Sequence, residues 1–579
     1  MRATRLSPTR LLLAALASHF FLIGPQAFAL SVTWDGGGAD DRFDTPENWS
    51  GDLAPASGST TDLYFAGPLR LTPSNTFTAG SDLGSIIFDA GAGAFNVGGS
   101  GINLYGRIEN NSTTTQTVSL SSLSLTSTSE FRVPTGNLTI ALTGAGPNIL
   151  NNGNTVNVYG DNNKLLTFAA GTVISGSGGF RIREFSTVLF QSAQTYTGAT
   201  YIDSGRLFTG GTIGNNTSAI FLGSSQAAYA DTTANLFIEN SGLNMANPIT
   251  TSKADNGTSR GFGGRLIDGT FTSGTSTLSG GIEVNGGLTI SQSTGGTLKV
   301  SGVVRDGTEV GNVSRNVSIG LGTAVRGGVV QFTAGNTYTG TTSVTSGTLE
   351  LNNDGSATNG RIGGTTAISV TRNSTLLLSG SSVVRDRINN SSTLVLGQST
   401  IAGTGGTLNT GGLSEGTAPT GPGGVGGVVG IGALSLRANT TIDFTAANGG
   451  SALVFQSLSF VSGTVANITH WTGPAGANGL DHLLFAINPN LTANDLRLVQ
   501  FTNDAGTNFA TGGLIVDYNG YYELVPITAV PEPATWVGAT LALLSVGFAR
   551  IGKRAGPRLW TNVGSGRSAC LARSASREV

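Results

Sequence analysis

The densest group of carboxylates in the sequence lies close to its N-terminal end. It comprises Asp35, Asp40, Asp41 and Asp44, with Glu47 beside them. Calcium binding needs several oxygen ligands around one cation, and these side chains could supply them. Their spacing, however, fits neither an EF-hand loop nor the nonapeptide calcium repeat. A solvated turn that holds this segment together is therefore the preferred interpretation, and we predict neither a metal nor another cofactor.

Arginine and carboxylate side chains also occur together at several points along the middle of the chain. If the fold aligned such groups on one face, they could bind or cleave a polysaccharide. The Arg-Asp pair recurs, which favours a repeated structural turn over a single catalytic site, and a fold alone does not imply an activity. The candidate residues are Arg181, Arg183, Glu184, Arg305, Asp306, Arg385 and Asp386.

Other catalytic and binding chemistry finds little support in the composition. The three histidines are His19, His470 and His482, so the middle of the chain cannot hold a Ser-His-Asp or Cys-His arrangement. The single cysteine is Cys570, and no cluster has the spacing of a zinc site. The formal net charge of −2 gives no electrostatic basis for binding nucleic acid. We predict that the protein is not an enzyme.

The elements that would position these side chains are predicted to be short β-strands. Charged residues make up only 11% of the 579 residues, and there are 88 glycines. The hydrophobic fraction of 38% is too high for simple disorder. Short runs of Val, Ile, Leu and Phe alternate with Thr and Ser and are broken by Gly and Asn, which indicates many short strands.

Two stretches of the chain repeat one another, "TYTGATYIDSGRLF" from Thr195 and "TYTGTTSVTSGTLEL" from Thr337. The spacing predicts a strand, a glycine bend with positive φ, and a second strand. One such unit cannot bury its apolar face alone, so stacked units are expected to share one interior. The shared positions are Tyr196 and Tyr338, Gly198 and Gly340, Gly205 and Gly347, and Leu207 and Leu349.

These stretches resemble the autotransporter-associated β-strand repeat, which implies a right-handed parallel β-helix over residues 68–430. Residues 30–67, with Trp34 and Trp49, are expected to form an N-terminal cap over the first coil. The Gly-rich stretch 403–432 is expected to be a loop or joint. Residues 431–526 are predicted to form a C-terminal β cap that contains a short helix capped by Thr492 or Asn494.

The first 29 residues have the order of a secretory signal peptide. Arginines come first, an apolar stretch follows over residues 11–23, and small residues at Ala27 and Ala29 mark the expected cleavage site. We therefore expect the secretion machinery to export the chain.

A second targeting signal is predicted in residues 527–554. An uncharged stretch over residues 534–549 follows Pro531-Glu532-Pro533, and basic residues follow that stretch, which predicts a single transmembrane helix with the basic tail 555–579 in the cytoplasm. The apolar anchor would consist of Trp536, Leu541, Leu543, Leu544, Val546 and Phe548.

"VPEPATW", from Val530 to Trp536, resembles the PEP-CTERM sorting signal. The resemblance implies a bacterium with an outer membrane, an exosortase-type enzyme that cleaves near Pro531-Glu532-Pro533, and a destination at the cell surface or in the extracellular matrix. The tail after Arg554 is longer than the family pattern. We thus expect an exported, non-catalytic scaffold or adhesin. The alternative is a β-helix that binds or cleaves glycans, with extracellular polysaccharide as its partner.

Overall fold

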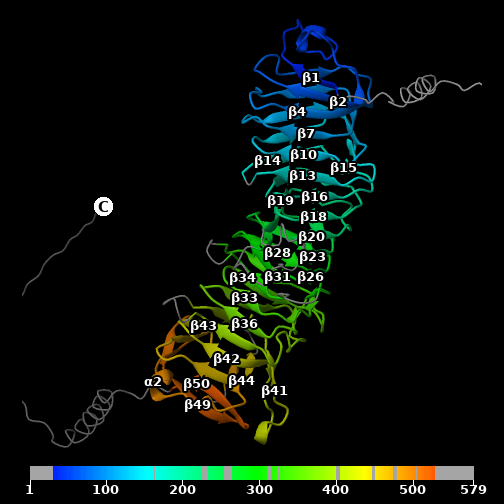
Figure 1. Cartoon of the computed structure of the whole chain (residues 1–579). Helices are drawn as coiled ribbons and strands as arrows, with labels where there is room; N and C mark the ends of the chain where they lie inside the picture. The colour runs from blue at the N-terminus through cyan, green and yellow to red at the C-terminus, as the bar shows by residue number, and fades with distance from the viewer. Residues whose placement is uncertain are drawn as a thin grey trace, which may run out of the picture. The chain divides into compact units, whose positions relative to one another are not determined.

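A computed structural model describes residues 30–527 except for 162, 225–232, 253–263, 310–314, 322–325, 399–404, 446–449, 474–478 and 504. These residues form one compact unit that is almost entirely β. In Figure 1 the strands follow one another in chain order, from β1 (Leu30–Trp34) at one end of the unit to β49 (Gly513–Tyr518) and β50 (Tyr521–Pro526) at the other. The predicted all-β class, with long parallel sheets, is therefore confirmed.

Successive strands along the chain lie on different faces of the coil, and most of them pair in parallel with the equivalent strand of the next coil. In sheet A, Phe131 lies opposite Ile108 of one neighbour and Val158 of the other. A coil of strands stacked in this way is the arrangement of a β-solenoid. The main strands of sheet A are β1 (Leu30–Trp34), β2 (Gly58–Phe65), β4 (Ser81–Phe88), β7 (Arg107–Asn110), β10 (Glu130–Val133), β13 (Val156–Gly160), β16 (Phe180–Ile182), β18 (Thr200–Ile202), β20 (Ile220–Leu222), β23 (Ile249–Thr251), β26 (Ile282–Val284) and β29 (Val304–Asp306).

Sheet B forms the second face of the coils. It contains β3 (Ser74–Asn75), β5 (Asn96–Gly99), β8 (Gln116–Leu120), β11 (Leu138–Ile140), β14 (Leu165–Phe168), β17 (Thr187–Phe190), β19 (Gly205–Thr209), β21 (Ala234–Ile238), β24 (Arg265–Gly269), β27 (Leu288–Gln292), β30 (Val317–Ile319), β33 (Thr342–Val344), β36 (Ala367–Val370), β38 (Thr393–Leu396), β42 (Ile431–Leu436), β44 (Ala452–Phe460) and β46 (His482–Phe485).

The third face begins as a branch of sheet A and continues as sheet C. The branch leaves β4 and contains β6 (Ile102–Leu104), β9 (Leu123–Leu125), β12 (Ile149–Leu150) and β15 (Ile174–Ser175). Sheet C contains β22 (Asn244–Met245), β25 (Gly274–Leu278), β28 (Gly296–Val300), β31 (Val329–Phe332), β34 (Thr348–Asn352), β37 (Thr375–Ser379), β39 (Thr407–Asn409), β43 (Thr440–Asp443), β45 (Ala466–Thr469), β47 (Val499–Thr502) and β48 (Asn508–Thr511). A short pair, β32 (Gly335–Asn336) and β35 (Arg361–Ile362), lies apart from these sheets.

The coils enclose one continuous hydrophobic core. Alternate side chains point inward because successive residues of a strand face opposite ways. In β10, for example, Phe131 and Val133 are buried, whereas Glu130 and Arg132 lie on the outer surface. The main cluster of buried apolar residues extends from Val32 to Val525. The outward positions are therefore the ones available for binding.

The two copies of the repeated motif have the same local structure. The Tyr196 hydroxyl lies 2.7 Å from Oγ1 of Thr200, and the Tyr338 hydroxyl lies 2.7 Å from Oγ1 of Thr342. Both tyrosines are completely buried, as are the two leucines of the motif, Leu207 and Leu349.

The glycines of the motif serve two purposes. The bend glycines, Gly205 and Gly347, have φ values of 114° and 70°, where a residue with a Cβ is strained. Gly198 and Gly340 have no room for a Cβ, because it would overlap the backbone of the preceding coil.

The two copies occupy different corners of the coil. Tyr196 follows the face of β15, since the Thr195 amide bonds to the Ile174 carbonyl, and its motif then enters sheets A and B. Tyr338 follows the face of β29, since the Thr337 amide bonds to the carbonyl of Val304, and its motif then enters sheets B and C. The second copy is therefore displaced by one face.

The two ends of the described unit differ from its middle. Near β1, Trp34 and Trp49 are buried and meet edge to face with ring centroids 5.1 Å apart, next to the short helix η1 (Pro46–Asn48). At the other end, sheet B is covered by the antiparallel pair β49 (Gly513–Tyr518) and β50 (Tyr521–Pro526), and sheet C by antiparallel β48. These elements cover strand edges that would otherwise invite pairing with another chain.

Strand pairing does not change at the boundaries expected from the sequence. β1 and β2 are already parallel members of sheet A, and β42 to β47 continue the parallel stack beyond residue 431. Only β48 to β50 are antiparallel there. The expected short helix is α2 (Ala493–Leu496), and Thr492 caps it.

The Gly-rich stretch is more ordered than a simple joint. Residues 414–430, called the arm below, form the antiparallel pair β40 (Gly416–Thr417) and β41 (Val428–Val429) with the helical turn η3 (Pro422–Gly424) between them. Glu415 at the base of the arm forms a parallel bridge with Leu453 of β44.

Candidate functional site

The predicted targeting residues lie outside the described residues. This applies to Ala27 and Ala29 of the signal peptide, to the sorting signal Pro531-Glu532-Pro533, and to the whole expected membrane anchor. Within the described part of the chain, no helix is both long and apolar enough to cross a membrane.

The N-terminal carboxylates form hydrogen bonds with their neighbours. Asp44 accepts two bonds from the Arg42 guanidinium, at 2.9 and 2.8 Å. Asp40 accepts bonds from the Thr45 hydroxyl and the Arg42 amide, which hold the pKa of its carboxyl below the usual value. Asp41 bonds to two side chains that follow β2, Arg70 and Thr72. Among the described residues no group of His, Cys, Asp or Glu is placed to hold a metal ion.

The candidate residues for polysaccharide chemistry do not converge on one place. Only Arg181 and Arg183 lie together; both approach Oδ2 of the buried Asp203, at 2.5 and 3.5 Å. Glu184 occupies a turn with φ of 54°.

The remaining candidates lie further along the chain. Arg305 pairs with Glu283 at 2.6 Å, and Asp306 accepts two bonds from Thr339. Asp386 pairs with Arg361, while the carbonyl of Arg385 accepts the Gly416 amide.

A track of arginines and tyrosines follows the outer face of sheet A from β7 to β18. Strand register places Arg132 opposite Tyr159 and Arg181 opposite Tyr201, while Arg107 lies opposite Glu130. The guanidinium of Arg132 lies 5.0 Å from the centre of the Tyr159 ring, and that of Arg183 lies 5.7 Å from the same ring. We call the following residues the arginine track: Arg107, Arg132, Tyr159, Arg181, Arg183 and Tyr201.

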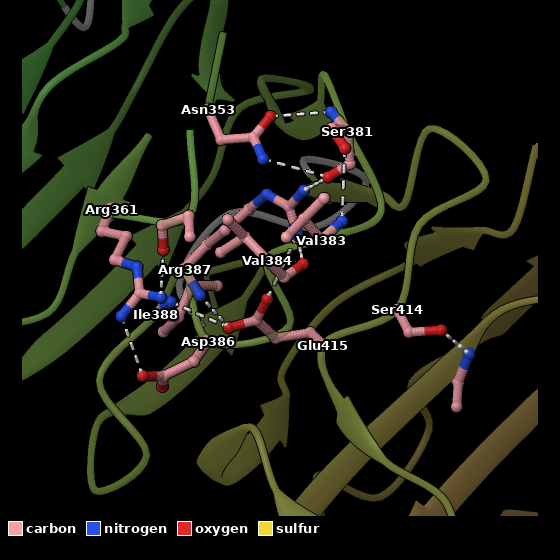
Figure 2. Close-up of polar contacts among 12 residues, drawn as sticks. Asn353, Arg361, Ser381, Val383, Val384, Asp386, Arg387, Ile388, Ser414 and Glu415 are labelled. Atoms are coloured by element: carbon pink, nitrogen blue, oxygen red, sulfur yellow. Dashed lines mark hydrogen bonds and ion pairs between the residues drawn. The ribbon is translucent and has the colours of Figure 1, made fainter. Parts of the chain in front are cut away.

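A second charged cluster is completely buried at the base of the arm (Figure 2). Neither the Arg387 nor the Glu415 side chain is exposed, and Nη1 of Arg387 lies 3.9 Å from Oε2 of Glu415. The other carboxylate oxygen, Oε1, accepts the amides of Arg387 and Ile388 at 2.7 and 2.8 Å. The guanidinium donates to the carbonyls of Ser381 and Val384. The cluster thus ties the arm to the turn that follows β37.

Burial dominates the charge state of this pair. It raises the pKa of the Glu415 carboxyl to about 8, although two amides and the guanidinium of Arg387 favour the anion. Burial also lowers the pKa of Arg387, against the attraction of Glu415. Perturbed groups occur at functional sites and in structural ion pairs alike. Because both side chains here are sealed from solvent, the arrangement can hold two segments together but offers no access to a substrate.

An open hollow lies near this cluster on the outside of the coils. Its volume is about 330 Å³, and glycine and threonine residues line most of it, with Arg361 as the charged group. Arg361 is engaged on two sides, by Asp386 at 3.2 Å and by the carbonyl of Ala357 at 2.7 Å.

Both histidines of the described chain are bonded to carboxylates near the last coils. Nδ1 of His470 lies 2.6 Å from Asp443, and Nδ1 of His482 lies 2.7 Å from the buried Glu523. These pairs connect neighbouring strands of sheet C and of sheet B, respectively.

Sequence reasoning missed Glu415, although a signal was present. It is the only charged residue in the stretch 403–432. A lone carboxylate in such a stretch is expected to have a specific partner.

The fold defines a stacked, parallel, β-solenoid class of protein. Comparison of the chain with models of known families, with curated proteins and with solved structures found no match.

Proposed function

We propose that the protein is an exported, non-catalytic component of the cell surface or extracellular matrix, with its stacked coils acting as a scaffold or adhesin. The observation that carries this proposal is the continuous core from Val32 to Val525, enclosed by parallel sheets along the whole described chain. Such a stack holds its outer residues at fixed intervals, as a presenting surface requires. We expect the coil to be a right-handed β-helix, as the resemblance of the repeated motif to the autotransporter-associated β-strand repeat implies.

The location rests on the two terminal signals of the sequence. Residues 1–29 would direct export, and residues 534–549 would hold the protein in the inner membrane as a single helix. An exosortase-type enzyme would then release it near Pro531-Glu532-Pro533. This order of events makes the membrane contact transient or permanent according to whether cleavage takes place.

Mass spectrometry of protein shaved from the surface of intact cells tests this proposal. We expect a mature N-terminus at Leu30 and a C-terminus close to Pro533. Recovery of the chain only from the cytoplasm, with residues 1–29 still attached, would exclude export.

A second candidate function is glycan binding or cleavage. The observation that favours binding is the arginine track on sheet A, which includes two residues identified in the sequence, Arg181 and Arg183. Incubation of the purified protein with acidic polysaccharides tests both activities. Retention without shortening of the polymer indicates binding, and loss of polymer length indicates cleavage.

A further inference from the structure

We infer that the arginine track binds a uronic-acid polysaccharide that lies along the stacking axis. This inference rests on the glycan-binding candidate above and names its surface, its ligand class and the direction of the ligand. Three features carry it: the layering of charge, the atoms that remain available, and the regular spacing of the strands.

Charge on this face is arranged in two layers. Each arginine pairs with a carboxylate that is less exposed than itself: 43% against 13% for Arg107 and Glu109, and 22% against 2% for Arg181 and Asp203. Arg132 and Glu130 follow the same order. On this face the positively charged hydrogen-bond donors are therefore more accessible than the carboxylates that accept from them.

The ion pairs leave the outer ends of three guanidiniums available. Arg107, Arg132 and Arg181 each donate to their carboxylate through Nε. Within the described residues, their terminal Nη1 and Nη2 groups have no hydrogen-bond partner. A guanidinium can bind two oxygens of a carboxylate or of a sulfate in a two-pronged manner, but the carboxylate is the more basic anion and the stronger hydrogen-bond acceptor. The available atoms therefore favour the carboxylate of a uronic acid.

Aromatic rings hold these guanidiniums in place. Arg132 and Arg183 lie against Tyr159, and Arg181 lies 4.9 Å from the centre of the Tyr201 ring. Tyr201 in turn stacks on Phe221, with ring centres 5.0 Å apart and planes 9° apart. Cation–π contacts restrict the rotamers of the arginines before a ligand arrives, which lowers the entropy lost on binding.

The spacing of the track suits a polymer better than a single sugar. Its strand arginines lie on β7, β10 and β16, with Tyr159 on β13 between them, and neighbouring strands are about 4.8 Å apart, so the three steps from Arg107 to Arg181 span about 14 Å. A chain with a carboxylate on each sugar can meet several guanidiniums at once, and each contact after the first is intramolecular. A single uronic acid can contact only one or two of these guanidinium groups.

Calorimetry of the purified full chain with polygalacturonate tests the inference. The triple variant R107Q/R132Q/R181Q is expected to bind about tenfold more weakly or worse, since it loses three of the linked contacts. The control variant R42Q/R206Q/R497Q removes the same number of charges from exposed positions outside the track, and we expect wild-type affinity. Equal weakening in both variants would show that net charge alone drives binding and would overturn the inference.

Two further arms test the chemistry of the ligand. Neutral dextran should not bind, and dextran sulfate should bind more weakly than polygalacturonate. Equal affinity for both anionic polymers would contradict the uronic-acid assignment.

The variant R107K/R132K/R181K keeps the charge but lacks the planar guanidinium groups, so it should also bind polygalacturonate weakly. Wild-type affinity of this variant would count against the track. If the glutamine variant does not fold, as judged by thermal unfolding, the lysine variant decides. Surface shaving is a separate measurement, so failure of glycan binding leaves the scaffold proposal intact.

Discussion

Arg387 and Glu415 lie side by side inside the protein, with no exposed surface on either side chain and 3.9 Å between Nη1 and Oε2. They come from the turn after β37 and from the base of the arm. A buried ion pair of this kind gains little net stability, but breaking it leaves a charge without compensation. Its effect is therefore best measured through pH and through paired substitutions.

The stability of the protein should fall as pH rises from about 4.5 to about 8. Glu415 has a pKa of about 8 in the folded protein, against an ordinary value of 4.5. The folded state thus binds more protons than the unfolded state within this window, so the free energy of unfolding decreases with pH and levels off above it. The loss due to this group should be on the order of 3–5 kcal/mol.

Glu415→Gln should remove most of that pH dependence, because the amide does not ionise. Chemical denaturation at several pH values between 5 and 9 measures it. Glu47→Gln, at an exposed position near the N-terminus, is the matched control and should keep the wild-type slope. An unchanged slope in Glu415→Gln would show that Glu415 is not the titrating group.

Arg387→Met should destabilise the protein more at pH 9 than at pH 5. At pH 9 the substitution leaves the Glu415 anion buried without its partner, which costs on the order of 3–5 kcal/mol. At pH 5 the carboxyl is neutral and the cost should be smaller. Adding Glu415→Gln should recover much of the stability lost at pH 9. A double-mutant cycle at both pH values checks this, and a coupling that does not vary with pH would contradict it.

Tyr196→Phe and Tyr338→Phe should each destabilise the protein. Each removes one buried hydroxyl and its bond to Thr200 or Thr342, at a cost of about 1 kcal/mol, and the loss at Tyr338 should be no larger because Thr342 keeps a second bond, at 2.9 Å, to Thr365. The two losses should add, since the sites lie in separate coils. Tyr105→Phe, at a half-exposed position, should be close to neutral. A large effect at one site alone would show that the two copies of the motif do not play equivalent roles.

Gly340→Ala should destabilise the protein by about 1–3 kcal/mol, since the new Cβ would overlap the backbone of Arg315 and Asn316 in the coil before it. Gly198→Ala should behave alike. Gly91→Ala is the control, because a Cβ there meets nothing within 4 Å. Thermal unfolding of the three variants measures the difference, and equal midpoints would contradict close packing between coils.

The sequence allowed the β class and the motif residues to be predicted because they depend on local patterns. Tyr196 and Tyr338 stand at the same distance from a glycine and a leucine, so comparison of the chain with itself finds them. Contacts between coils are harder to predict because the length of a coil varies. Phe180 lies opposite Thr200, whereas Ala234 lies opposite the more distant Arg265.

Most of the arginine track could not be predicted from the sequence for the same reason, because the pairing of strands between coils is not encoded locally. Arg181 and Arg183 stood out in the sequence as a pair, but nothing local places Arg132 beside Tyr159. Glu415 was missed as well. Its partner Arg387 lies 28 residues earlier in the chain, on the turn after β37, and no local pattern pairs the two.

The displacement of the repeated motif by one face has a consequence for how such a chain can vary. The same unit fits the corner between sheets A and B and the corner between sheets B and C. Its sequence therefore does not determine which corner of the coil it occupies. An insertion or deletion of one strand and its bend would move every later outward-facing residue to the neighbouring face of the coil. The hydrophobic core would remain filled. The direction in which a downstream surface points would then be set by the number of units that precede it.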